Sequence, residues 1–146
     1  MQYWLLKTEP EEWSWIDQVK SGGKGAEWNG VRNFQAAKNL KNMKKGDRCF
    51  FYHTGKIKSI VGIAEVIKEA YLDKTDKTGK FVSIAVKALY PLKREVRLKE
   101  IKKNKVFKDF SLSFFKFFTV LRTAVFKPAK DKLHPPFLKI GFGNLK

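Results

Sequence analysis

The chain has 146 residues, of which 43% are hydrophobic, and this balance is typical of one globular domain and excludes a disordered chain. It carries 31 Lys and Arg against 14 Asp and Glu, a formal net charge of +17, which favours polyanions and above all nucleic acid as partners. No apolar run approaches the roughly 20 residues that cross a bilayer, so we expect no membrane partner. The first residues lack the pattern of a secretory signal, so we expect an intracellular protein, cytoplasmic or, in a eukaryote, nuclear.

The positive charge comes mainly from lysine, and it is most concentrated in the last third of the chain. Lysine favours diffuse attraction to phosphates over the bidentate reading of bases for which arginine is suited. A lysine-rich composition can also arise from genome composition alone, without any binding role. Charge therefore favours a nucleic-acid partner and leaves that alternative open.

The chain opens with an apolar and aromatic segment over residues 2–7, which predicts a buried strand. A short helix is expected to begin at Thr8–Glu11, because Pro10 suits a first turn and the neighbouring acids suit the positive end of a helix. This helix is expected to run to about Lys20, where the glycine-rich residues 21–25 end it.

An irregular segment over residues 27–33 follows, with a turn at Asn29-Gly30. Asn33 can accept a backbone N–H through its side chain, so it is expected to cap a second helix over residues 34–43. These features place a loop between the glycine-rich segment and the second helix.

Three strands are predicted next, over residues 48–54, 57–71 and 81–90. Gly62 interrupts the second of them and marks a bulge or a close approach of another group. Pro91 is expected to end the third strand because it lacks a backbone donor.

The last third predicts a short helix within residues 96–105, an aromatic-rich segment over 107–118, a closing strand over 120–126 and a small helix over 133–140. Long antiparallel strands with few helices predict an α+β fold. We expect a curled, mostly antiparallel sheet or small β-barrel with flanking helices.

Enzyme signatures are absent from the sequence: it has no phosphate loop, no dinucleotide glycine pattern and no nucleophile elbow. His53 and His134 are too isolated for a metal site, and Cys49 in an apolar strand is expected to be a buried small hydrophobe. We therefore expect no catalytic residue, no metal and no cofactor.

All four tryptophans lie within the first 28 residues. Trp4 and Trp13 are expected in the core. Trp28 lies among Asn and Gly residues in a predicted loop, so a ligand contact and a core position are equally plausible for its indole.

Five motifs occur in order along the chain. They are Tyr3-Trp4-Leu-Leu-Lys-Thr-Glu-Pro10, Trp13-Ser-Trp15, Trp28-Asn-Gly-Val-Arg32-Asn33, Phe50-Phe-Tyr52-His53-Thr54 and Ile60-Val-Gly62-Ile-Ala-Glu-Val66. In this order and spacing they resemble the EVE domain of the PUA-like superfamily, which is related to YTH and ASCH domains. The resemblance covers roughly residues 2–101.

The resemblance implies one EVE domain over residues 1–146, divergent from about residue 102, that forms a PUA-like small β-barrel with flanking helices and a pocket on one face. It implies a monomeric nucleic-acid-binding module that holds a modified base, for example a methylated one, of DNA or RNA in an aromatic pocket. Aromatic faces replace the stacking that a flipped base loses.

By motif position, the resemblance suggests ten residues for the pocket or its rim. They are Trp28, Val31, Arg32, Asn33, Tyr52, His53, Thr54, Lys7, Thr8 and Arg122. Structural alternatives stay open, because Asn33 can be only a helix cap and Tyr52 only a core residue. Two other functions also stay open: an enzyme or accessory factor acting on nucleic acid or nucleotides, and a module that binds RNA by its backbone alone.

Overall fold

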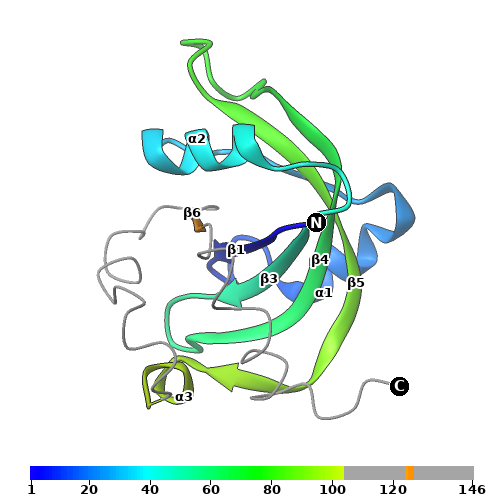
Figure 1. Cartoon of the computed structure of the whole chain (residues 1–146), viewed down its shortest axis with the longest axis vertical. Coiled ribbons are helices and arrows are strands. Elements are labelled where there is room, and N and C mark those ends of the chain that lie inside the picture. The colour runs from blue at the N-terminus through cyan, green and yellow to red at the C-terminus, as the bar shows by residue number, and fades with distance from the viewer. Residues whose placement is uncertain (104–123, 127–146) are drawn as a thin grey trace.

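The computed structural model describes residues 1–103 and the backbone of residues 124–126. These residues form a strongly curved sheet with helices packed on it (Figure 1). The strands are β1 (Tyr3–Thr8), β2 (Ala26–Trp28), β3 (Arg48–His53), β4 (Ser59–Leu72), β5 (Val82–Arg97) and β6 (Ala124–Phe126). The helices are α1 (Trp15–Lys20), α2 (Phe34–Asn42) and α3 (Leu98–Lys103), and a 3₁₀ turn covers Gly22–Lys24.

The six strands are ordered β2-β5-β4-β3-β1-β6. In the described part of the chain only β1 and β3 pair in parallel, and the other neighbours pair antiparallel. The predicted α+β class and mostly antiparallel sheet are therefore confirmed. Within the described residues the edge strands β2 and β6 do not pair with each other, so the closed barrel stays a prediction.

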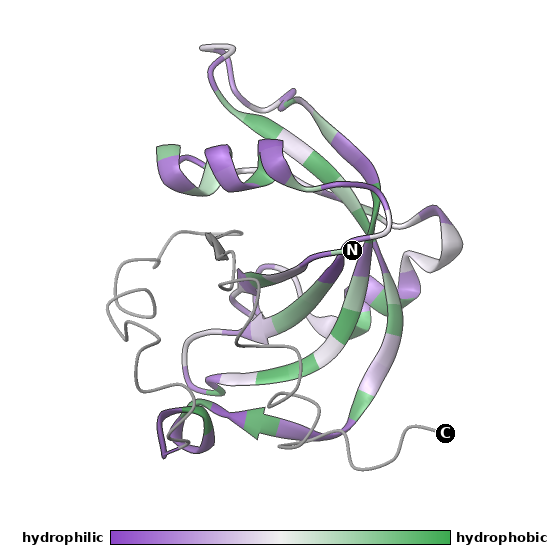
Figure 2. Cartoon of the chain, in the orientation of Figure 1, coloured by the Kyte–Doolittle hydropathy of each residue, from purple (hydrophilic) through white to green (hydrophobic). Residues whose placement is uncertain are grey.

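Side chains along β3 alternate between two cores on opposite faces of the sheet, as the pleat of a strand requires. The first core is a cluster of Trp4, Leu6, Trp28, Val31, Ala36, Leu40, Met43, Cys49, Phe51, Ala64, Val66, Val82, Ile84 and Val86. The second core is a cluster of Leu5, Phe50, Tyr52, Ile60, Ile63, Val96 and Ile101. Figure 2 shows hydrophobic residues concentrated on the strands and hydrophilic residues over much of α2.

Helix α1 begins later than the sequence predicts, and the expected start at Thr8–Glu11 is wrong. The N–H groups of Glu12 and Trp13 bond to the carbonyl of Glu9, which closes a turn. Ser14 then caps the helix through a reciprocal pair of bonds: its hydroxyl accepts the Asp17 N–H at 3.1 Å, and the Asp17 carboxylate accepts the Ser14 N–H at 2.9 Å. This capping box satisfies two free donors, so it fixes the start of the helix more strongly than Pro10 and its acidic neighbours do.

Helix α2 begins as predicted, because the Asn33 side-chain oxygen accepts the Ala36 N–H at 2.9 Å. Strand β5, in contrast, does not end at Pro91 but continues to Arg97. Strand β2 covers the outer edge of β5 only as far as Val86. On the inner edge Pro91 pairs with Gly62, next to a shift in the register of β4 and β5, and an irregularity of this kind tolerates a missing N–H. Residues 107–118, the helix predicted at 133–140 and most of the strand predicted at 120–126 lie outside the described residues.

Gly62 lies on β4 where the register against β3 and β5 shifts, and the predicted close approach there is confirmed. A Cβ atom at this position would overlap the six-membered ring of Trp15, which lies across the strand. The absence of a side chain at Gly62 thus allows Trp15 to reach Phe51 on β3 (ring centroids 5.2 Å apart, 67° between planes).

We therefore expect Gly62→Ala to lower the free energy of unfolding by about 1–3 kcal/mol, because the added methyl group overpacks the contact with Trp15. Urea denaturation followed by tryptophan fluorescence measures the change. Gly23→Ala is the matched control and should have a much smaller effect, because a Cβ atom at Gly23 would meet no atom within 4 Å. Equal effects of the two substitutions would contradict this account.

Candidate functional site

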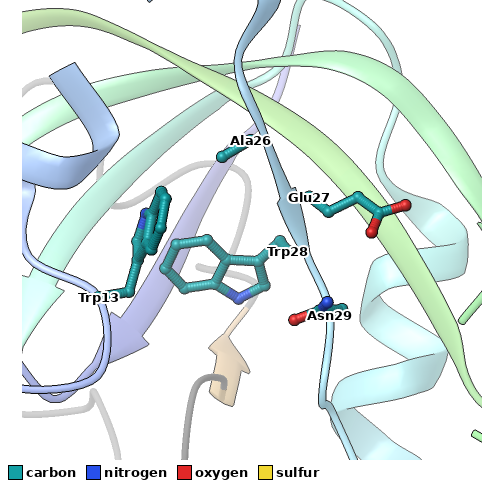
Figure 3. A pocket seen from close by; sticks show the side chains of 5 residues that line it. All are labelled: Trp13, Ala26, Glu27, Trp28 and Asn29. Atoms are coloured by element: carbon teal, nitrogen blue, oxygen red, sulfur yellow. The ribbon is translucent and has the colours of Figure 1, made fainter. Parts of the chain in front are cut away.

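A pocket of roughly 200 Å³ opens between the segment that precedes α1 and strand β2. The described residues that line it are Trp13, Ala26, Glu27, Trp28 and Asn29 (Figure 3). Ala26 and Trp28 point to the same side of β2, and Figure 3 shows the Trp28 ring directed toward Trp13. The carboxylate of Glu27 extends to the other side of the strand, where it accepts the Tyr71 hydroxyl at 2.9 Å.

Trp28 forms one wall of the pocket and also belongs to the first core. It ends β2 rather than lying in a loop as predicted, and it pairs with Ile84 of β5. Only 3% of the residue is exposed, and its ring packs edge-to-face against Phe51 with centroids 5.4 Å apart. Its indole N–H is buried and has no hydrogen-bond partner within the described part of the chain. A buried donor without a partner is costly to the stability of the fold.

Trp13 forms the facing wall and is only partly buried. Its Nε1 donates to the Gln18 side-chain oxygen at 2.9 Å. Gln18 is fully buried and in turn donates to the Val86 carbonyl at 2.8 Å. These bonds fix the indole against α1 and β5. Trp13 also packs against the first core, where the sequence predicts it, but it precedes α1 rather than lying on the helix.

The Phe51 ring links this pocket to the ends of β1 and β3. Besides Trp28 and Trp15, Phe51 contacts the ring of His53 edge-on at 5.6 Å. His53 Nε2 accepts the backbone N–H of Trp15 at 3.1 Å, so the neutral ring carries its proton on Nδ1. Burial lowers the pKa of His53 below its usual 6.5, with the negative charges of Glu11 and Glu95 acting in the opposite direction.

Thr8, His53 and Thr54 lie together where the parallel strands β1 and β3 end. Thr8 pairs with His53 in the register, and the Thr54 N–H donates to the Thr8 carbonyl at 2.9 Å. The structure thus brings these three predicted residues side by side, and it connects them to the pocket through Trp15 and Phe51.

The other residues of the Trp28 motif have structural roles. Val31 is fully buried in the first core, and Asn33 caps α2. Arg32 donates to the buried Asp73 carboxylate at 2.7 Å and to the Thr75 hydroxyl at 2.7 Å. These bonds with Arg32, Thr75 and the Gly30 N–H outweigh desolvation and hold the pKa of Asp73 at about 2.

Lys7 and Tyr52 lie on the face of the sheet opposite to Trp28. Tyr52 belongs to the second core, and Lys7 Nζ lies 5.9 Å from the centroid of its ring. Burial lowers the pKa of Lys7 to about 8 and raises that of Tyr52 to about 12. The expected convergence of Trp28 and Tyr52 on one cavity is not found, because Phe51 and Tyr52 are neighbours on a pleated strand and point to opposite faces. Arg122 lies outside the described residues.

The described residues hold no group of three His, Cys, Asp or Glu side chains that could bind a metal ion. The Cys49 thiol is fully buried, as predicted, and burial raises its pKa. Over residues 1–103 and 124–126, no helix has the length and apolar character to cross a bilayer. The pocket is lined by the indoles of Trp13 and Trp28, whose aromatic surface suits contact with a flat ring.

The lowered pKa of His53 predicts how stability depends on pH. The unfolded chain binds a proton near pH 6.5, whereas the folded chain binds it only at lower pH, so stability falls as pH decreases below about 6.5. Compared with His53→Gln, the wild type should therefore lose stability between pH 7.5 and 5.5. Urea titrations at three pH values in this range measure the difference, and parallel curves for the two proteins would contradict it.

Arg32→Ala should lower the free energy of unfolding by about 1–2 kcal/mol, because the buried Asp73 carboxylate loses its charged partner. The cost is moderate because the Arg32 side chain is 36% exposed. Denaturant unfolding measures the change. Arg94→Ala is the control, because its pair with Glu100 is more exposed and should contribute little. A neutral Arg32→Ala would show that Asp73 does not depend on this partner.

Solved structures with similar folds extend over nearly the whole chain. An NMR structure of a Rhodopseudomonas palustris protein has a TM-score of 0.84 and 41% identity, and the match covers 97% of this chain and 94% of that one. The crystal structure of a human thymocyte nuclear protein in complex with 5-methylcytosine-containing DNA has a TM-score of 0.73 and 28% identity, with 95% and 96% covered. A YTH domain of Zygosaccharomyces rouxii, at 14% identity and a TM-score of 0.54, shares the fold alone.

Among curated proteins, thymocyte nuclear protein 1 of Gallus gallus is 42% identical over 83 residues. That match covers 50% of this chain and 34% of the chicken protein, so this chain spans about a third of that relative's length. Residues 2–126 match the family described as the EVE domain. This match extends past residue 101, where the resemblance noted from the sequence motifs ends. The chain therefore belongs to the EVE domain family.

Proposed function

We propose that this protein is a reader of modified bases in nucleic acid, and that the pocket between Trp13 and Trp28 holds a methylated base of DNA or RNA. The observation that carries the proposal is the pair of indoles on facing walls of one pocket. Its volume, roughly 200 Å³, is below the roughly 300–1,000 Å³ of sites for drug-sized ligands and suits a single flat ring.

The chemistry of the pocket fits a flipped base. Removing a base from its stack costs a few kcal/mol, and stacking on aromatic side chains restores about 1–3 kcal/mol per base. A methyl group adds apolar surface, which an indole-lined pocket buries favourably.

Two further observations support a nucleic-acid ligand. The human relative, 28% identical, was crystallised with DNA that contains 5-methylcytosine. The net charge of +17 provides the long-range attraction to phosphates that nucleic-acid binding requires.

The site does not favour an enzyme. Among the described residues that line the pocket, Glu27 alone is titratable, and its carboxylate extends away from the pocket toward Tyr71. A general acid or base must reach the reacting group within about 3 Å or through one water, and a Glu27 in this position does not. A module that grips only the backbone would have no use for facing indoles, so the pocket favours base recognition.

Trp13→Ala should reduce the affinity for an oligonucleotide containing 5-methylcytosine by about 1–3 kcal/mol while the fold persists, because Trp13 is only partly buried. Fluorescence anisotropy with labelled oligonucleotides measures the affinity, and circular dichroism checks the fold. Trp28→Ala is a poorer test, because removal of an almost fully buried indole costs about 3–5 kcal/mol of stability. Trp28→Phe instead keeps most of the ring and removes the Nε1 donor.

Ile16→Ala is the matched control: it changes an exposed apolar side chain on the adjacent helix α1, outside the pocket lining. It should leave both the affinity and the preference for the modified base unchanged. If the wild type binds modified and unmodified oligonucleotides equally, or if Trp13→Ala keeps the wild-type preference, this pocket is not a modified-base site.

A further inference from the structure

The end of the hairpin between β4 and β5 carries a set of exposed cations. Lys74, Lys77 and Lys80 are all exposed, and within the described part of the chain none of them forms an ion pair. Other lysines are partly neutralised: Lys44 pairs with Glu69, and Lys87 with Glu65. The hairpin end, at the top of Figure 1, therefore presents three positive charges to solvent.

The shape of this hairpin end is fixed by its own acids. Asp76 accepts the N–H groups of Thr78, Lys80 and Phe81 at 2.9–3.0 Å and the Thr78 hydroxyl at 2.7 Å. These bonds outweigh desolvation and lower the pKa of Asp76 to about 2. The Asp76 carboxylate thus binds the backbone of the hairpin, and these bonds fix the backbone positions of the lysines.

The hairpin end is also tied directly to the pocket. Asp73 accepts the N–H of Gly30 at 2.9 Å, and Gly30 follows Asn29, which lines the pocket. Arg32 adds a second bond to the same Asp73 oxygen. The lysines are consequently held at a set distance from the base pocket rather than on an independent arm.

An exposed aromatic ring lies beside this hairpin. Phe34, the first residue of α2, is 71% exposed and packs against Phe81 with ring centroids 5.1 Å apart. The Arg32 guanidinium lies 5.5 Å from the Phe81 centroid. A phenylalanine this exposed next to unpaired cations matches the pattern of single-strand binding, in which bases stack on aromatic rings and lysines contact phosphates.

We propose that Lys74, Lys77, Lys80 and Phe34 form a second contact surface for the nucleic acid, here called the hairpin surface. It binds the phosphates and one unpaired base of the strand that flanks the base held in the pocket. The proposal rests on the function proposed above for the pocket. In this proposal the hairpin surface contributes affinity that does not depend on the base modification. The pocket distinguishes the modified base from the unmodified one.

The test compares two triple variants with the same change in charge. In the first, Lys74, Lys77 and Lys80 are replaced by Ala; in the control, Lys99, Lys102 and Lys103 are replaced. The control lysines are exposed on α3, at the opposite end of β5 from the hairpin (Figure 1). Single-stranded oligonucleotides of about 12 nucleotides, with cytosine or 5-methylcytosine at the centre, serve as probes across a range of salt concentrations.

We expect the hairpin triple variant to bind both probes at least tenfold more weakly than the wild type. The magnitude of the slope of log K against log salt concentration should fall by about 2, because each phosphate contact on a single strand contributes roughly 0.7. The ratio of the two affinities should stay at the wild-type value. The α3 triple variant should lose less than threefold. Equal losses by the two variants, or no loss by the hairpin variant, would overturn the proposal.

Phe34→Ala provides an independent arm and should weaken binding of both probes about fivefold or more. Its control, Ile57→Ala, changes a 43% exposed side chain in the turn between β3 and β4, at the other end of β4. A wild type that binds the two probes equally would refute base discrimination by the pocket. The contribution of the hairpin surface can still be measured with the unmodified probe alone. Failure of the pocket proposal and failure of the hairpin proposal are therefore distinguishable.

Discussion

The ring of Phe51 is the contact on which the arrangement of the site depends. Trp15, Trp28 and His53 all pack edge-on against it, and they come from α1, β2 and the end of β3. Helix α1 and the short edge strand β2 thus both contact the one Phe51 side chain of strand β3. The Trp28 wall of the pocket keeps its position because its ring is held from behind, while only its outer surface remains for a ligand.

Buried carboxylates organise the rest of the molecule in a similar way. Asp47 accepts the Trp4 indole N–H at 2.8 Å and the Gln2 N–H at 2.7 Å, which joins β1 to the turn before β3. Asp73 joins the Gly30 segment to the hairpin. Because these acids bond inward, they do little to neutralise the exposed lysines, so the protein combines an ordered interior with a surface that attracts polyanions.

The sequence predicts the elements that depend on local chemistry and misses those that depend on distant partners. The Asn33 cap, the burial of Cys49 and the close approach at Gly62 follow from residue type and neighbours, and the structure confirms them. The continuation of β5 past Pro91 depends on its pairing with β4, which local sequence does not encode.

The candidate site was only partly predictable for the same reason. Trp28 is recognisable from its motif, but its partner Trp13 depends on where α1 begins, and the separation of Tyr52 from Trp28 depends on the faces of β3. Motif matching treats residues that are adjacent in sequence as neighbours in space. On a strand, adjacent residues point in opposite directions, so Tyr52 and His53 belong to different surroundings.

The long strand β5 has a consequence for association between copies of the chain. Beyond Val86 its outer edge has no partner strand among the described residues, and an open edge of this kind invites pairing with a second sheet. Pro91 supplies no N–H for such pairing, so a strand added at this edge would lack one hydrogen bond of its ladder. The proline therefore limits aggregation through strand addition at this edge, while the basic surface of the protein remains available to a polyanion.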